Sequence, residues 1–192
     1  MQNAIILHGR SYLHKDYISC ENSESNRHWI PWLQWEMIKS GILTQTPEMP
    51  NPYFDAIDYD DWVKTFKQFN VDENSILIGH SCGGGFLLKY LSNHPDIKIK
   101  HLVLIAPWID VEQEHPTFFK NFEPSKNIAN QCDRIDLIHS TDDKEKIALS
   151  AEKIRKIFGN KIIYHEFNNK RHFTESTMGT KFPELLEIIK QG

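Results

Sequence analysis

Short apolar runs alternate with longer amphipathic stretches along this chain. Runs rich in Ile, Val and Leu predict strands at Ala4–His8, Ile42–Thr46, Ser75–Gly79, His101–Ala106, Arg134–His139 and Lys161–Phe167. Helical patterns fall between or after them, at Pro31–Lys39, Tyr59–Phe69, Gly83–Asn93, Lys146–Phe158 and Pro183–Lys190. Most of the strand runs are unbroken, which is typical of strands covered on both faces. The alternation therefore predicts an α/β fold with a parallel sheet between two layers of helices.

Two segments interrupt this rhythm. Leu13–His28 and Asp110–Asn130 are irregular, and each follows a predicted strand. Loops at the carboxyl ends of parallel strands form the ligand crevice of such sheets, so both segments are expected to overhang an active site. No linker divides the 192 residues, and we expect one domain over residues 1–192.

Composition narrows the class of protein. The chain is 40% hydrophobic with a formal net charge of −4, which excludes disorder and argues against nucleic acid or an anionic membrane as partner. The cysteines form an odd, widely spaced set, a poor disulfide framework that fits a reducing compartment: Cys20, Cys82 and Cys132. Neither a signal peptide nor an apolar run long enough for a bilayer is readable, so we expect a cytoplasmic protein.

A candidate nucleophile lies between a predicted strand and a predicted helix. Gly79-His80-Ser81-Cys82-Gly83 matches the Gly-x-Ser-x-Gly nucleophile elbow. The elbow serine occupies a strained turn in which the residues two positions to either side crowd each other, and glycine removes that clash. We therefore predict Ser81 as the nucleophile; a glycine-rich turn that binds phosphate is the alternative. Cys82 is expected to offer its main-chain N–H, with its thiol packed as a small apolar group.

A base and an acid are expected after the last two strands, because this type of site runs Ser, Asp or Glu, then His along the chain. His172 is the histidine in the loop after the last strand, and Asp142 and Asp143 follow the strand before it. Spacing alone does not separate the two carboxyls: one would orient the imidazole, and the other would cap a helix or face solvent. Other histidines are expected to pack, shape a turn or face solvent, and none forms a metal motif: His8, His80, His139 and His165.

Together with Met49-Pro50-Asn51-Pro52 and Ser140-Thr141-Asp142-Asp143, these motifs resemble the small serine hydrolases of the retinoblastoma-binding-protein-9 type. The resemblance runs along nearly the whole chain. It implies an α/β-hydrolase core of about six parallel strands with helices on both faces and little or no cap domain. The predicted serine chemistry is expected to need no cofactor. The resemblance also places the acid three residues after the serine of the Ser-Thr-Asp-Asp turn, which favours Asp143. The oxyanion donors implied by the family are the main-chain N–H groups of Cys82 and of Arg10, just beyond the first strand.

Two arginines depart from the family pattern. Arg10 stands where relatives often carry glycine, and Arg171 stands where many have glycine before the base. One hypothesis is that they favour anionic substrates; the alternative is two solvated surface side chains. Tryptophans at helical spacing predict core packing at Trp29, Trp32 and Trp35, and Trp108 is the candidate to line the pocket.

The sequence therefore predicts a serine hydrolase, in particular a carboxylesterase acting on a small-molecule acyl ester. Ser81 would attack the carbonyl, His172 would act as base and acid, and Asp143 would orient His172. An amidase or peptidase with the same residues is one alternative, and a binding protein that kept the hydrolase fold is another. The physiological substrate and the oligomeric state are not encoded in any motif of the sequence.

Overall fold

A computed structural model describes residues 2–11, 23–53, 55–115 and 117–192 of the chain. Its centre is a six-stranded sheet in the order β2-β1-β3-β4-β5-β6, and every neighbouring pair of strands is parallel. The strands are β1 (Asn3–Leu7), β2 (Leu43–Gln45), β3 (Ser75–His80), β4 (Ile99–Ile105), β5 (Cys132–Ser140) and β6 (Ile163–Phe167). Every residue of β1 and of β3 is buried, as expected for inner strands covered on both faces.

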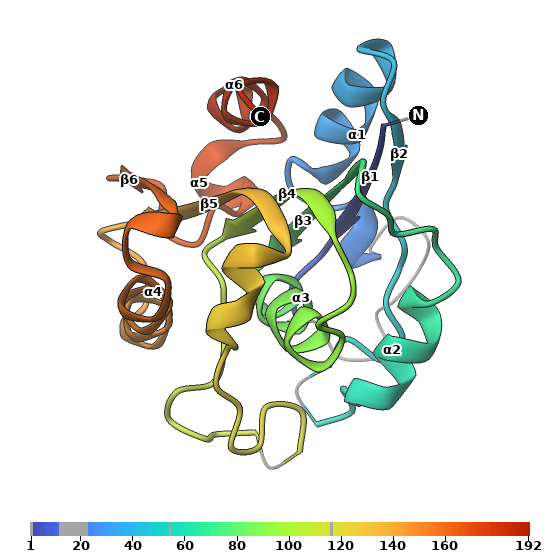
Figure 1. The fold of residues 1–192 in the computed structure, drawn as a ribbon. Coiled ribbons are helices and arrows are strands. Elements are labelled where there is room, and N and C mark those ends of the chain that lie inside the picture. The colour runs from blue at the N-terminus through green and yellow to red at the C-terminus, as the bar shows by residue number, and fades with distance from the viewer. Residues whose placement is uncertain (1, 12–22, 54, 116) are drawn as a thin grey trace.

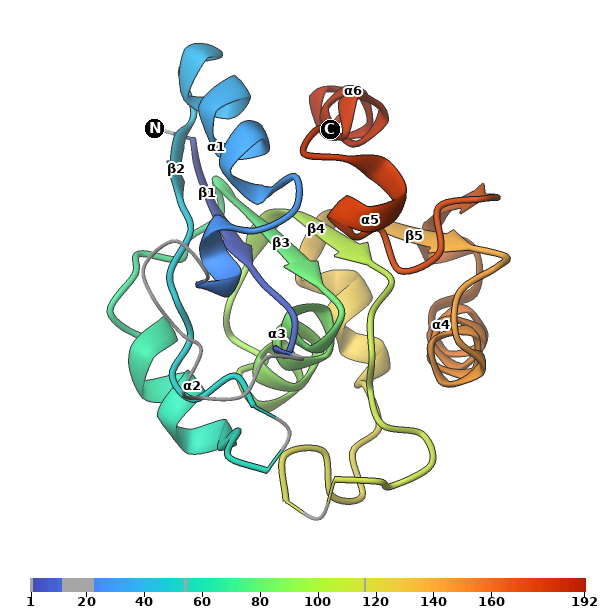
Figure 2. The ribbon, with the colours of Figure 1, turned by 180° about the vertical axis from the view of Figure 1, so that it is seen from behind.

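Helices cover both faces of this sheet (Figures 1 and 2). One face carries α1 and α6, and the other carries α2, α3 and α4. The helices are α1 (Ile30–Lys39), α2 (Tyr59–Phe66), α3 (Cys82–Asn93), α4 (Glu145–Phe158), α5 (Glu175–Met178) and α6 (Pro183–Lys190). The predicted three-layer α/β architecture is confirmed. None of the helices in the described part of the chain is long and apolar enough to cross a bilayer.

Element boundaries differ from the sequence prediction at several ends. The structure ends α2 at Phe66, three residues before the predicted Phe69, and begins β6 at Ile163, after a 3₁₀ turn at Gly159–Lys161. The short helix α5 was not predicted, because four residues are too few to display a periodic pattern. Between β4 and β5 the described residues contain a single helical segment, the 3₁₀ turn Lys126–Asn130.

The prediction that the tryptophan stripe packs in the core is correct for only part of it. Trp29 is fully buried, Trp32 is partly buried, and Trp35 is 60% exposed. The reason is that the apolar face of α1 turns inward through Ile30, Leu33 and Met37, which leaves Trp35 on the solvent side. The predicted loop Leu13–His28 lies mostly outside the described residues, as does Cys20; Cys82 and Cys132 are free thiols.

Candidate active site

The elbow motif forms a sharp turn between β3 and α3. Ser81 has φ 53° and ψ −119°, a left-handed conformation that costs a non-glycine residue on the order of 1–3 kcal/mol. A Cβ on Gly79 would lie 2.5 Å from Cα of Gly84, and a Cβ on Gly83 would lie 2.5 Å from the carbonyl oxygen of His8. Space therefore requires glycine at both positions. The predicted crowding between the two positions is seen in part: a Cβ on Gly79 would lie 2.7 Å from the main-chain carbonyl carbon of Gly83, whereas the clash at Gly83 is with Leu7 and His8 at the end of β1.

The turn after β1 passes directly beside Ser81. A Cβ on Gly9 would lie 2.9 Å from the Cβ of Ser81 and 3.4 Å from its Oγ. A small cavity of about 10 Å³ at this point is lined by Gly9, Arg10, Ser81 and His172, among others. A space of this size holds about one water-sized group.

Ser81, His172 and Asp143 form a continuous chain of hydrogen bonds. His172 Nε2 lies 2.9 Å from Ser81 Oγ, and His172 Nδ1 lies 2.9 and 3.2 Å from the two carboxylate oxygens of Asp143. The side chains of His172 and Asp143 are 10% and 1% exposed. Because the carboxylate only accepts, Nδ1 carries a proton and Nε2 is left to accept one from the serine hydroxyl. We refer to these three residues as the Ser81 cluster.

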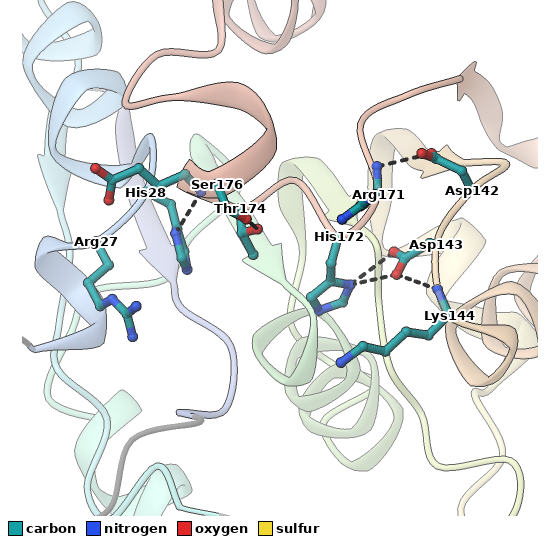
Figure 3. Close-up of a pocket in the computed structure, with 10 residues that line it drawn as sticks. Arg27, His28, Asp142, Asp143, Lys144, Arg171, His172, Thr174 and Ser176 are labelled. Atoms are coloured by element: carbon teal, nitrogen blue, oxygen red, sulfur yellow. Dashed lines mark hydrogen bonds and ion pairs between the residues drawn. The ribbon is translucent and has the colours of Figure 1, made fainter.

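The two neighbouring aspartates have different partners (Figure 3). Asp143 binds the ring of His172 and accepts from the main-chain N–H of Lys144 at 2.7 Å. Asp142 points away from the imidazole; its Oδ1 accepts from Ser140 Oγ at 2.6 Å and from the Arg171 main-chain N–H at 3.0 Å. These hydrogen bonds lower the pKa of Asp142. Spacing alone left the two carboxyls open and the resemblance favoured Asp143; the structure brings Asp143 to His172, while Asp142 links the turn after β5 to the loop after β6.

The thiol of Cys82 is fully buried, and burial raises its pKa to about 12. Burial therefore favours the protonated thiol at neutral pH, which disfavours Cys82 as a nucleophile. The main-chain N–H of Cys82 belongs to the first turn of α3, where N–H groups have no acceptor within the helix. The Arg10 guanidinium stacks on the Trp108 ring at 5.0 Å from its centroid. Trp108 is 4% exposed and lines neither of the two pockets described at His172.

An open pocket of about 720 Å³ is lined by His172 but not by Ser81. One wall comes from the segment before α1, with Arg27 and His28, and the opposite wall comes from the turn after β5, with Lys144 (Figure 3). Arg171 and Glu175 also line it, so charges of both signs surround the pocket. Arg27 is paired with Glu24 at 2.8 Å.

A second set of ionisable side chains lies within the sheet, on the face toward α6. Asp136, which is 0% exposed, accepts from His101 Nε2 at 2.5 Å, from His165 Nε2 at 2.6 Å and from Arg134 Nε at 2.5 Å. We call these four residues the Asp136 cluster. The prediction that His165 merely packs or faces solvent is therefore incomplete, because alternation along three neighbouring strands places it beside a buried carboxylate. The described residues contain no group of three or more His, Cys, Asp or Glu side chains arranged to bind a metal.

This fold and this site define an α/β hydrolase. The sequence profile of the alpha/beta hydrolase fold family matches residues 18–163, and the chain belongs to that family. YdeN of Bacillus subtilis (strain 168), a provisionally assigned hydrolase, is 32% identical over 73 residues, 37% of this chain and 37% of its own length. The aligned region thus spans little more than a third of that curated relative.

Solved structures extend the similarity to the whole fold. The crystal structure of the B. subtilis ydeN gene product covers 100% of this chain and 98% of its own, with a TM-score of 0.83 and 20% identity. Est1E from Butyrivibrio proteoclasticus covers 99% of this chain and 87% of its own, with a TM-score of 0.66 and 15% identity. At these identities the two structures support the fold and not a substrate.

Proposed function

We propose that this chain is a serine hydrolase that works through an acyl-enzyme, with Ser81 as nucleophile, His172 as general base and acid, and Asp143 as the residue that orients His172. The observation that carries the proposal is the continuous hydrogen-bonded chain Ser81–His172–Asp143, with 2.9 Å at each step. A strained elbow holds its first member, and such strain persists where the surrounding structure enforces it.

The first half of the reaction forms the acyl-enzyme. Ser81 Oγ attacks the substrate carbonyl carbon while its proton passes to His172 Nε2. The carbonyl π bond opens to an oxyanion, and Asp143 stabilises the imidazolium from the Nδ1 side. The oxyanion then reforms the carbonyl, the bond to the leaving group breaks, and His172 gives its proton to the departing oxygen.

The second half returns the enzyme to its starting state. Water gives a proton to His172 Nε2 and attacks the acyl carbon, and the resulting intermediate releases the acid as the proton returns to Ser81 Oγ. His172, which gives its proton to the leaving group, lines the open pocket, so we propose this pocket as the leaving-group side of the site.

The oxyanion would be held by the main-chain N–H groups of Cys82 and Arg10. The Cys82 N–H lies at the start of α3, whose positive end favours a developing negative charge. Arg10 follows Gly9, which is in contact with Ser81, and the small cavity between them fits a single oxygen atom. Removing one such donor costs about 3–4 kcal/mol of barrier stabilisation in other serine hydrolases.

Within this class we propose a carboxylesterase for small acyl esters, of the retinoblastoma-binding-protein-9 type. The sequence motifs named above support that subfamily, and a single 3₁₀ turn is the only helical segment described between β4 and β5, which agrees with a hydrolase that has little cap. No cofactor enters the proposed chemistry, because an activated serine supplies the nucleophile and main-chain N–H groups supply the electrophilic assistance.

Labelling with a fluorophosphonate probe tests the nucleophile. We expect the wild-type protein to be labelled, and Ser81→Ala and His172→Ala to be unlabelled although folded by circular dichroism. Labelling that persists in Ser81→Ala would place the reactive group elsewhere. A folded wild type that resists the probe would contradict the hydrolase proposal and favour a binding protein that retained the fold.

Matched substrates test the class of acyl bond. We expect turnover of a para-nitrophenyl acetate ester to exceed turnover of the corresponding acyl anilide by several orders of magnitude. Comparable rates on aminoacyl anilides would instead identify an amidase or peptidase that uses the same three residues.

A further inference from the structure

The loop that carries His172 is held by ring nitrogens from distant parts of the chain. Trp29 Nε1 donates to the carbonyl of Phe173 at 3.0 Å, and His28 Nδ1 accepts from the Glu175 N–H at 3.1 Å. His80 Nε2 donates to the carbonyl of His172 itself at 2.9 Å. Three successive parts of the loop main chain are therefore fixed by side chains that the proposed chemistry does not use.

His80 differs from the other two because it precedes the proposed nucleophile. Ser81 Oγ meets the ring of His172 at Nε2, and His80 Nε2 meets the main-chain carbonyl of the same residue. Two consecutive residues of the elbow thus bind the two ends of His172. The rings of His80 and His172 also lie 5.0 Å apart between centroids.

The protonation state of His80 allows its Nε2–H to donate to the His172 carbonyl at all times. A carbonyl oxygen only accepts, so the proton of His80 is on Nε2, while its buried Nδ1 has no hydrogen-bond partner among the residues that the structure describes. Burial, followed by the nearby charges of His172 and His28, lowers the pKa of His80 well below 6.5. His80 therefore stays neutral and does not add a second positive charge beside the imidazolium of His172.

The His172 loop needs this support because its backbone is strained on both sides. Arg171 has φ 43° and Phe173 has φ 53°, and neither is glycine. Such residues cost on the order of 1–3 kcal/mol each and relax unless neighbouring contacts hold them. Relaxation about either residue would rotate the imidazole away from Ser81 Oγ.

We propose that His80 is a positioning residue: its Nε2–H holds the His172 carbonyl and thereby keeps the His172 imidazole within reach of Ser81 Oγ. This inference rests on the proposed function, since it assigns His80 a part in the activity of His172. It acts through main-chain geometry and not through contact with the substrate.

The test is a double-mutant cycle on ester hydrolysis. His80→Phe keeps an aromatic ring and removes the N–H, and we expect kcat to fall about 100-fold with little change in KM, as for a catalytic group displaced by about 1 Å. His80→Gln, whose side-chain amide offers an N–H, is expected to recover most of this loss. In the His172→Ala background, His80→Phe is expected to cause no further loss, because the group it positions is gone.

Gln131→Met is the matched control for lost stability. Gln131 is 1% exposed, and its Nε2 donates to main-chain carbonyls at the other end of the sheet: Leu91, His94 and Ile97. We expect this variant to lower the free energy of unfolding without lowering kcat. If His80→Phe does not fold, His80→Asn replaces it, because the asparagine amide is too short to reach the carbonyl.

Each contrary outcome has its own meaning. Unchanged kcat in a folded His80→Phe overturns the positioning role and leaves the proposed function standing. An equal loss in the His172→Ala background also overturns it, since His80 would then act through the elbow alone. Absence of wild-type labelling and turnover defeats the proposed function and this inference with it.

Discussion

The Ser81 cluster and the Asp136 cluster each pair a buried carboxylate with imidazole, yet the first is built on loops that follow the strands and the second on the strands themselves. In the Ser81 cluster the far nitrogen of His172 meets a hydroxyl, and the residues on either side of His172 are strained. In the Asp136 cluster the histidines come from regular strand positions on β4 and β6, and the buried Nδ1 of His101 has no hydrogen-bond partner in the described ranges of the chain.

Charge balance is the second difference. Arg134 neutralises Asp136 permanently, and its Nη1 also donates to the Gln191 carbonyl near the end of the chain. Within the described part of the chain no arginine pairs with Asp143, and its carboxylate faces an imidazole whose charge depends on proton transfer. A carboxylate left available in this way can stabilise a cation that forms during a reaction, whereas one already paired with arginine can only stabilise the fold.

The largest expected effect comes from removing the charge of Asp143. Asp143→Asn keeps the shape of the side chain but no longer stabilises the imidazolium or fixes the tautomer of His172. We expect kcat for ester hydrolysis to fall on the order of 10⁴-fold, as for the equivalent change in serine proteases, with a small change in unfolding free energy. Steady-state kinetics and urea denaturation measure the two quantities.

Asp142→Asn is the matched control for this prediction. Its amide oxygen can still accept from the Arg171 N–H, so we expect less than about a tenfold loss of kcat. If Asp142→Asn proved the more damaging variant, the assignment of the acid to Asp143 would be wrong.

The Asp136 cluster should respond in the opposite way. Asp136→Asn leaves Arg134 and the fully buried His101 without their carboxylate, and we expect a loss of about 3 kcal/mol in the free energy of unfolding. Because the cluster lies away from the proposed active site, kcat per folded molecule should not change. A selective loss of kcat would show that the two clusters are coupled.

The features that the sequence could predict are those formed by residues close together in the chain. Strand and helix runs, the elbow and the loops after β5 and β6 are local patterns, so the fold and the positions of Ser81 and His172 follow from them. The choice between Asp142 and Asp143 depended on resemblance, because adjacent residues in a turn differ only in side-chain direction. In the structure the Asp143 side chain is hydrogen-bonded to the His172 ring, and the Asp142 side chain is hydrogen-bonded to the Arg171 main chain.

Other features join residues far apart in the chain, and no spacing rule reveals them. The Asp136 cluster depends on the register of three strands, which pairs His101 with Arg134 and Val103 with Asp136. The contact between His80 and His172 joins residues 92 positions apart. A buried histidine in the elbow was visible in the sequence, but its partner was not.

The free energy of unfolding should fall in two separate pH ranges as the solution is acidified, and His80 is responsible for part of the first. The folded chain keeps His80 neutral, whereas the unfolded chain protonates it near pH 6.5, so unfolding takes up a proton and stability falls as the pH drops below that value. Each pH unit costs about 1.4 kcal/mol per such histidine until the folded pKa is reached. The pKa values of His28 and His139 are also lowered, by burial first, and add to this loss.

Asp136 acts in a lower pH window. Burial alone would raise its pKa, but hydrogen bonds from His101, Arg134 and His165 outweigh burial and hold the pKa well below 3.8. Its contribution to the free energy of unfolding is therefore present above pH 3.8 and is lost as the pH falls below that value.

Urea denaturation at a series of pH values, from neutral to about pH 3, measures the free energy of unfolding in both pH ranges. Near pH 6, His80→Gln should reduce the slope of the unfolding free energy against pH, and below pH 3.8 Asp136→Asn should reduce it. Identical slopes in all variants would contradict both assignments.

The smallest expected effect concerns Arg171, where strain and charge act on the same residue. Arg171→Gly removes the conformational strain of φ 43° at a non-glycine residue, but it also raises the conformational entropy of the unfolded chain. We therefore expect the free energy of unfolding to rise by no more than about 1 kcal/mol. The guanidinium also lines the open pocket at His172, and its loss should slow a carboxylate-bearing ester about two- to fivefold relative to its neutral analogue. Arg171→Lys separates the two causes, because lysine keeps the positive charge and the strained backbone. If Arg171→Lys and Arg171→Gly discriminate between the two esters equally, the charge of Arg171 has no part in substrate choice.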